Sequence, residues 1–131
     1  MRRLPKPTDA ELEVLCVLWK RGPSTVRDIH AIVDRQKARG YTTILKTLQI
    51  MTDKGLVIRD EAERSHVYRP RYSETQTQRQ LIRDIVDRAF GGSAAKLMLQ
   101  VLGTRAATPE ELAELRALLD VRRRERAKGK P

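Results

Sequence analysis

The first apolar residues of the chain have the spacing of a helix with one buried face. They stand three or four positions apart, and Thr8 and Glu11 form the pair of side chains that caps a helix start. The sequence RGPS at 21–24 ends the pattern. We therefore expect a helix from Thr8 to about Lys20 with a cysteine in its buried stripe. The stripe consists of Leu12, Leu15, Cys16 and Trp19.

Two more helices are expected before residue 55. Thr25 and Asp28 can cap the first of them, and Gly55 suits the left-handed conformation that commonly follows a helix end. The second helix of the chain is expected to bury Val26, Ile29 and Val33. The third is expected to bury Tyr41, Ile44, Leu48 and Met51.

The period of the pattern changes to two after residue 55. Residues 56–60 (LVIRD) and 66–70 (HVYRP) are rich in β-forming side chains and flank a polar turn, so they predict a two-stranded hairpin. Pro70 cannot donate to a strand ladder, and we expect it to end the second strand or to lie at an edge. Three helices followed by a hairpin predict a winged helix-turn-helix in a mainly α-helical protein.

Three further helices are predicted after the hairpin. The fourth starts at Ser73 or Thr75, and two glycines at 91–92 end it. The fifth starts at Ser93 and is apolar nearly all round, so we expect it to be buried. The sixth starts with the capping sequence TPEE at 108–111.

The apolar faces of these last three helices predict a homodimer. Residues 73–121 are too few and too apolar to stand alone, and a second copy would cover them. Folding back onto the winged domain is the alternative. The expected organisation is a winged domain at 1–72, a dimerisation domain at 73–121 and a disordered basic tail at 122–131. The expected dimer contacts are Leu81, Ile82, Ile85, Ala89, Phe90, Leu97, Val101, Leu112, Leu115 and Leu119.

Positive charge is concentrated at the two ends of the chain. The 131 residues carry a net charge of +10; residues 1–72 hold 15 Lys and Arg against 9 Asp and Glu, and the last ten hold 6 against 1. This balance indicates a polyanionic partner for the winged domain. Nucleic acid fits better than a membrane, because no basic helix with an interfacial apolar face occurs. A basic surface that serves only solubility is the alternative.

The outer face of the third helix carries polar side chains suited to the major groove of DNA. Hydroxyl, ammonium and carboxamide groups can bind base edges and phosphates, and the free amides of the helix start near Thr42 can bind a phosphate. Leu45 either packs on the second helix or contacts a thymine methyl. The face consists of Thr42, Thr43, Lys46 and Gln49. The hairpin adds Arg59, Arg64, Arg69 and Arg71, of which two are expected to reach phosphates.

The side chains needed for an enzyme or a metal site are not found in the sequence. One cysteine cannot form an internal disulfide or a thiolate cage, and neither His30 nor His66 stands in the pattern of an activated nucleophile. We therefore expect no catalytic residue, no cofactor and no metal. No apolar run is long enough for a signal peptide or a membrane span, which favours a cytoplasmic protein without a membrane partner.

Four segments together carry a resemblance to a known family. They are TDAELEVLCVLWKRGPSTVRDI at 8–29, YTTILKTLQIMTDKGLVIRD at 41–60, HVYRP at 66–70, and FGGSAAKLMLQVL at 90–102 followed by EELAELRALL at 110–119. With them the chain from Pro7 to Asp120 resembles the penicillinase-repressor family (BlaI/MecI type) of bacterial transcription regulators.

The resemblance implies a homodimer whose winged domains bind a palindromic operator and whose C-terminal helices pair. By position it gives the recognition-helix role to Thr42, Thr43, Lys46 and Gln49, and the wing contacts to Arg64 and Arg69. Well-known members are cut at an Asn-Phe bond in the fifth helix after a signal from a membrane sensor-protease. Here Gln100 and Val101 stand at that bond. The cysteine cluster of the related copper-responsive repressors is absent from this sequence.

The function expected from the residues and the resemblance is repression of a promoter by a DNA-bound dimer. The implied targets are β-lactamase or other cell-wall-stress genes, and the implied release is proteolytic cleavage in the dimerisation region. A winged-helix adaptor that docks a protein partner without sequence-specific DNA binding is the alternative.

Overall fold

The computed structural model describes residues 4–62 and 64–129, apart from the side chain at position 36. The chain divides into two compact units, the first ending at Asp84 and the second beginning at Ile85. The sequence placed this division earlier, at 72/73. The start of the fourth helix thus belongs to the first unit.

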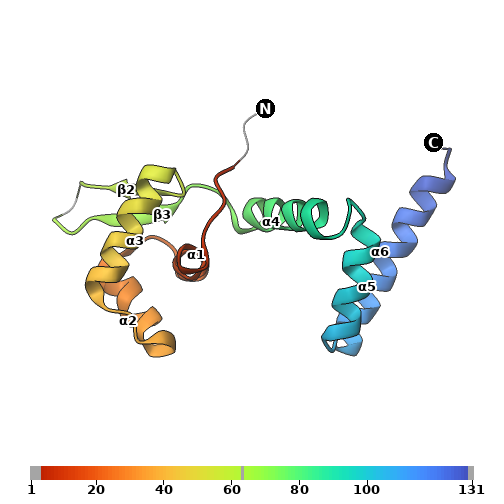
Figure 1. Cartoon of the computed structure of the whole chain (residues 1–131), viewed down its shortest axis with the longest axis horizontal. Helices are drawn as coiled ribbons and strands as arrows, with labels where there is room; N and C mark the ends of the chain where they lie inside the picture. The colour runs from red at the N-terminus through yellow and green to blue at the C-terminus, as the bar shows by residue number, and fades with distance from the viewer. Residues whose placement is uncertain (1–3, 63, 130–131) are drawn as a thin grey trace. The chain divides into compact units, whose positions relative to one another are not determined.

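The first unit contains the three helices of the predicted winged domain (Figure 1). Both expected capping pairs are confirmed: the hydroxyl of Thr8 accepts from the amide of Glu11 while the Glu11 carboxylate accepts from the amide of Thr8, and Thr25 and Asp28 repeat this arrangement. Gly55 follows the third helix in the left-handed conformation, with φ of 81°. The helices are α1 (Asp9–Arg21), α2 (Val26–Lys37) and α3 (Tyr41–Lys54).

The wing is a three-stranded antiparallel sheet, one strand more than the sequence predicted. Its strands are β1 (Ser24–Thr25), β2 (Val57–Asp60) and β3 (Val67–Pro70), in the order β1-β3-β2. β2 and β3 form the expected hairpin, which Pro70 ends, and Ser24 lies opposite Tyr68 on the other edge of β3. The prediction of only two strands was wrong, because a strand of two residues exists through its pairing and carries no alternating pattern of its own.

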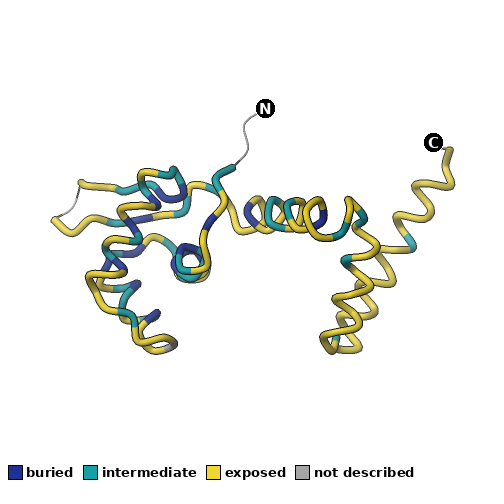
Figure 2. The backbone as a smooth tube through the Cα atoms, viewed as in Figure 1, coloured by how far each residue is buried: buried dark blue, intermediate teal, exposed yellow. Residues whose placement is uncertain are grey.

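The core of the first unit lies where the three helices meet the sheet, and it is drawn dark blue in Figure 2. Burying each large aliphatic or aromatic side chain contributes roughly 1.5–3 kcal/mol. The buried stripe predicted for α2 is confirmed, as is that of α3 apart from Tyr41. The core consists of Val14, Leu15, Leu18, Val26, Ile29, Val33, Ile44, Leu48, Met51, Leu56, Val57 and Tyr68.

The buried face of α1 is rotated from the predicted one. Its buried residues are Glu11, Val14, Leu15 and Leu18. Leu12 and Trp19 are half-buried, and the indole nitrogen of Trp19 donates to the carbonyl of Tyr72 at 3.1 Å. The spacing could not decide between the two faces, because apolar residues occupy both.

Cys16 and Tyr41 are exposed, which contradicts their predicted burial. Partial burial, followed by the charges of Glu74 and Glu13, raises the pKa of the Cys16 thiol. Tyr41 opens α3 with its ring edge-on to His30 of α2, the ring centres being 5.8 Å apart. It therefore packs on the neighbouring helix and not in the core.

Three more helices follow the wing: α4 (Glu74–Ala89), α5 (Ala94–Thr104) and α6 (Pro109–Ala127). Ser73, Ser93 and Thr108 each accept a hydrogen bond from an amide of the first turn that follows. α6 extends through Ala127, so residues 122–127 are helical and the prediction of a disordered tail was wrong for them. Arginine is a good helix former, which explains the extension. Residues 130 and 131 of the predicted tail lie outside the described residues.

Most of the large apolar side chains of α4, α5 and α6 are not buried within this chain, although Val86 is. No residue of α5 is buried, although an all-round apolar helix was expected to be. Among the predicted dimer contacts, Leu81, Phe90 and Leu97 are half-buried, and the others are exposed. Exposed apolar groups of this number are unusual on a monomer. From α4 to α6 they are Ile82, Ile85, Met98, Leu99, Val101, Leu102, Leu112, Leu115, Leu118, Leu119 and Val121.

Candidate nucleic-acid interface

The outer face of α3 is a row of exposed polar side chains. Ile44, Leu48 and Met51 anchor the helix in the core and thereby fix which side faces solvent. Ile50 lies on the solvent side and is 44% exposed, so an apolar group is also available there. Leu45 packs against the core, which answers the question that its sequence position left open. The row consists of Thr42, Thr43, Lys46 and Gln49.

The start of α3 differs from those of α1, α2, α5 and α6. A serine or threonine hydroxyl caps each of those helices, whereas α3 begins after Gly40 without a side-chain cap. The first amides of a helix have no acceptor within the helix, and they carry the positive end of its dipole. The start of α3 therefore offers donors to an anion, as the sequence predicted near Thr42.

The wing arginines differ in what they contact. Arg59 forms an ion pair with Glu61 at 2.7 Å, and this contact raises the pKa of Arg59. The guanidinium of Arg71 lies 5.8 Å from the centre of the Tyr72 ring. Arg64 and Arg69 are exposed, and neither forms an ion pair with any residue in 4–62 or 64–129. The two arginines chosen from the sequence are thus free for an external anion.

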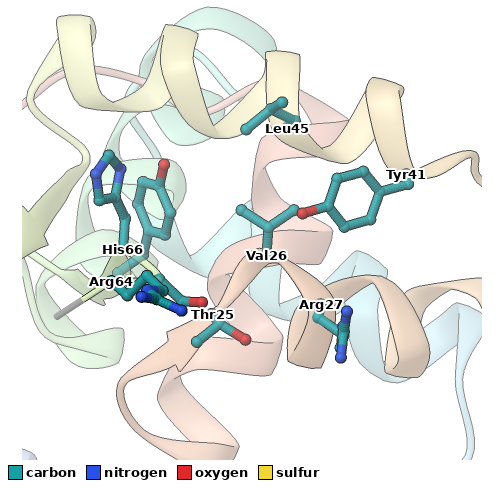
Figure 3. Close-up of a pocket in the computed structure, with 9 residues that line it drawn as sticks. Thr25, Val26, Arg27, Tyr41, Leu45, Arg64 and His66 are labelled. Atoms are coloured by element: carbon teal, nitrogen blue, oxygen red, sulfur yellow. The ribbon is translucent and has the colours of Figure 1, made fainter. Parts of the chain in front are cut away.

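A groove of about 470 Å³ lies between the start of α2, α3 and the wing (Figure 3). Val26, Leu45 and Tyr68 give it an apolar part, and Arg27 and Arg64 bring guanidinium groups from α2 and the wing. Arg69 is not among the lining residues, because successive side chains of a strand point to opposite faces and Tyr68 faces the groove. The remaining lining residues are Thr25, Tyr41, Ser65 and His66.

A comparison with protein families identifies the chain. The family model described as penicillinase repressor matches residues 7–121. The chain belongs to the penicillinase repressor family. Members of this family are transcriptional repressors and not enzymes.

Two curated members of the penicillinase repressor family match almost the whole chain. The transcriptional regulator BlaI of Mycobacterium tuberculosis is 29% identical over 122 residues, which cover 92% of this chain and 88% of that protein. The penicillinase repressor of Bacillus licheniformis is 25% identical over 120 residues, which cover 92% of this chain and 94% of that protein.

Two solution structures from the family confirm the winged-helix fold. One is the DNA binding domain of the repressor BlaI, and the other is the monomeric form of Bacillus licheniformis BlaI in complex with the blaP half-operator. Each is 28% identical, has a TM-score of 0.51, and covers 58% of this chain and 93% of the other.

Ion pairing distinguishes two sets of cations in the winged domain of this penicillinase repressor. Lys37 and Arg39 contact Glu13 at 2.7 and 3.3 Å, and Arg21 contacts Asp28 at 3.3 Å, so these cations hold helices together. A second group of exposed cations, on α2, α3 and the wing, has no ion pair with the described residues. It consists of Arg27, Lys46, Arg64 and Arg69.

The sequence analysis did not assign several groove residues of this penicillinase repressor to the site, Arg27 and Tyr41 among them. Arg27 was not singled out, and Tyr41 was predicted to be buried. Nothing in the spacing could have singled out Arg27, because Arg35 on the same helix is also exposed. Only the position of the wing next to the start of α2 distinguishes them.

Two findings concern other kinds of site. Within residues 4–62 and 64–129, no group of three or more His, Cys, Asp and Glu is placed to hold a metal ion. In the same part of the chain no helix combines the length and the apolar character needed to cross a bilayer.

Proposed function

We propose that this penicillinase repressor is a homodimer that represses transcription by binding a palindromic operator in double-stranded DNA. The observation that carries the proposal is the outer face of α3, where short polar groups and the unpaired Lys46 stand beside the groove and the wing. The Bacillus licheniformis relative, whose monomeric form was solved in complex with the blaP half-operator, supports DNA as the partner.

In this proposal α3 enters the major groove. Lys46 and Gln49 bind base edges, while Thr42 and Thr43 bind bases or phosphates near the uncapped helix start. Arg64 and Arg69 of the wing bind phosphates beside the groove, and Arg27 adds a phosphate contact that was not expected from the sequence. Base contacts select the site, whereas phosphate contacts hold the register and the orientation.

The second copy is proposed to cover the apolar faces of α4, α5 and α6. Their exposed leucine, isoleucine and valine side chains support this, because a twofold contact buries the same groups on both chains. Dimerisation also serves DNA binding. Once one winged domain is bound, the dimer holds the second winged domain near the DNA at a high effective concentration, so the second domain binds more readily.

Release of the operator is proposed to follow cleavage between Gln100 and Val101. Both residues are exposed and lie within α5. A cut there would separate the winged domain and α4 from α6, so the dimer contact would lose part of its apolar surface. By analogy with the named relatives, the regulated genes are proposed to be those of β-lactamase or of another cell-wall stress response.

A duplex-binding titration tests the proposal. The purified full chain is titrated against a random-sequence pool, the bound duplexes are selected and sequenced, and the affinity of the selected duplex is followed by fluorescence anisotropy. With roughly six to ten phosphate contacts, binding should weaken by about 10³–10⁵ between about 50 and 200 mM salt. Absence of duplex binding at low salt would reject the proposal and favour the protein-interaction adaptor.

A further inference from the structure

The last turns of α6 form a basic surface that has no role in the proposal above. The helix continues through Ala127, and residues 122–128 have the sequence RRRERAK. We call the cationic side chains of this segment the basic collar. The basic collar consists of Arg122, Arg123, Arg124, Arg126 and Lys128, all of which are exposed.

The basic collar begins where the apolar stripe of α6 stops. Leu112, Leu115 and Leu119 follow one another at spacings of three and four, which places them on one side of the helix. The next two positions on that side are occupied by Arg122 and Arg126, each seven residues after a leucine of the stripe. Arginines at these positions would repel the matching arginines of a second copy pairing in parallel. In such a pairing the proposed apolar contact along the stripe would end at Leu119.

The acidic side chains nearby do not neutralise the collar. Asp120 contacts Arg123 at 3.0 Å, and Glu125 contacts Arg122 at 3.6 Å. The side chains of both arginines are more than 70% exposed, and exposed pairs of this kind are weak and screened by salt. Arg126 and Lys128 form no ion pair with the described residues. Residues 120–128 thus hold two carboxylates and five cationic side chains, and the segment stays positively charged.

The collar also lies outside the family match. The penicillinase repressor match ends at residue 121, before the first arginine of the collar. The match therefore does not account for these residues, and a role for them must be sought in their own chemistry.

We infer that the basic collar binds the phosphodiester backbone of duplex DNA, outside the contacts made by α3 and the wing. Arginine forms paired hydrogen bonds with phosphate, and such contacts carry no base information. A membrane fits less well, because residues 122–128 have cations around the helix and no apolar face to enter a bilayer. This inference rests on the proposed function, to which it adds a second DNA contact.

The test uses a variant of the whole chain in which three arginines of the basic collar are replaced, so that the remaining charges of residues 120–128 cancel. The variant carries Arg122→Gln, Arg124→Gln and Arg126→Gln, since glutamine keeps the helix propensity and removes the charge. A matched control carries Arg79→Gln, Arg83→Gln and Arg116→Gln, three exposed arginines outside the collar that give the same change in net charge. Affinities for the selected duplex and for a scrambled duplex are measured across a range of salt concentrations.

The collar variant is expected to bind both duplexes more weakly and by the same factor, so that their affinity ratio is unchanged. The slope of log affinity against log salt should fall by about 0.9 for each phosphate that the variant no longer binds. The control variant should keep a slope closer to that of the unmodified protein. A chain shortened after residue 121 should reproduce the collar variant, which guards against an effect of the introduced glutamines.

Three results would overturn the inference while leaving the proposed function standing. In the first, the collar variant still binds the selected duplex, and its slope of log affinity against log salt equals that of the unmodified chain. Another is a collar variant whose dimer mass in sedimentation is reduced, which would assign the collar to the contact between copies. The third is tighter binding of the unmodified chain to phosphatidylserine vesicles than to the scrambled duplex. If the unmodified chain binds no duplex at all, the proposed function itself fails.

Discussion

The buried carboxylate of Glu11 lies 2.6 Å from the ammonium group of Lys54, which joins the first turn of α1 to the last turn of α3. The side chain of Glu11 is 5% exposed and that of Lys54 is 32% exposed. Glu11 also accepts from the amide of Thr8, so a single carboxylate completes a helix cap and a contact between two helices. It thereby helps to fix the orientation of the proposed recognition helix.

Replacing Glu11 with glutamine should destabilise the winged domain by about 1–3 kcal/mol, because Lys54 loses its charged partner in a largely buried site. The free energy of unfolding in urea measures this loss. Asp53→Asn is the matched control: Asp53 is exposed, and its replacement should stay within about 0.5 kcal/mol. Equal stabilities of the two variants would show that the Glu11–Lys54 contact contributes nothing.

The contact of Glu13 with Lys37 and Arg39 predicts a dependence of stability on pH. The hydrogen bond from Lys37, with a smaller effect of Arg39, lowers the pKa of Glu13 below its ordinary 4.5. Because the pKa is lower in the folded state, the charged carboxylate stabilises the fold above pH 4.5, and this contribution is lost as the pH falls through the folded-state pKa.

Glu13→Gln should therefore be less stable than the unmodified chain at pH 7, by less than about 1 kcal/mol because Lys37 is largely exposed. The difference should vanish in acid, and urea unfolding at a series of pH values measures it. A difference that stays constant from neutral pH into acid would contradict the assignment.

Substitutions on α3 and on the wing should affect DNA binding in different ways. Lys46→Ala or Gln49→Ala should relax sequence choice, at a cost of about 1–3 kcal/mol for the selected duplex and little for a scrambled one. Arg64→Ala should weaken both duplexes by the same factor, since a phosphate contact is common to them. Competition binding with labelled duplexes measures these ratios. Uniform losses for all three variants would remove the base-reading role from α3.

Two arginines of α2 offer a paired test of the groove. Arg27 lines the groove, whereas Arg35 is exposed further along the same helix and does not line it. Arg27→Ala should weaken binding to every duplex and reduce the salt slope by about 1, and Arg35→Ala should have a smaller effect. If the two variants bind DNA equally well, the groove does not hold a phosphate.

The proposed dimer predicts opposite outcomes for two charges on α6. Leu115→Asp places a carboxylate on the leucine stripe, where it would have to be buried against the second copy. Ala117→Asp places the same group about 200° away around the helix, where it can stay in water. Sedimentation should find monomers for Leu115→Asp and dimers for Ala117→Asp. A dimer that survives both substitutions would exclude the stripe from the contact.

Much of the winged domain could be predicted from short stretches of sequence, because its helix starts and ends depend on residues that lie close together in the chain. A threonine followed three residues later by an acidic side chain caps α1 and α2, and Gly55 ends α3 in the left-handed conformation. The position of β1 could not be predicted in this way. Ser24 and Thr25 become a strand only because β3, more than 40 residues further along, is there to pair with them.

The errors in α1 and the gaps in the candidate site have a common physical origin. An apolar helix such as α1 offers more than one stripe with helical spacing, and contacts with other elements choose among them. A charged residue such as Glu11 enters the core because Lys54 is present to pair with it. Likewise, Arg27 joins the groove only through the position of the wing, a relationship between distant segments that spacing does not encode.

Ser24 and Thr25 extend the sheet as β1, and Thr25 also caps α2. The sheet and the second helix thus share Thr25, and α2 begins at the residue that follows β1, with no linker between them that could let one tilt without the other. The join between hairpin and helices is therefore built into the backbone, whereas in our proposal the operator preference resides in a few solvent-facing side chains of α3. Such a protein can acquire a new target sequence through surface substitutions while its scaffold stays the same.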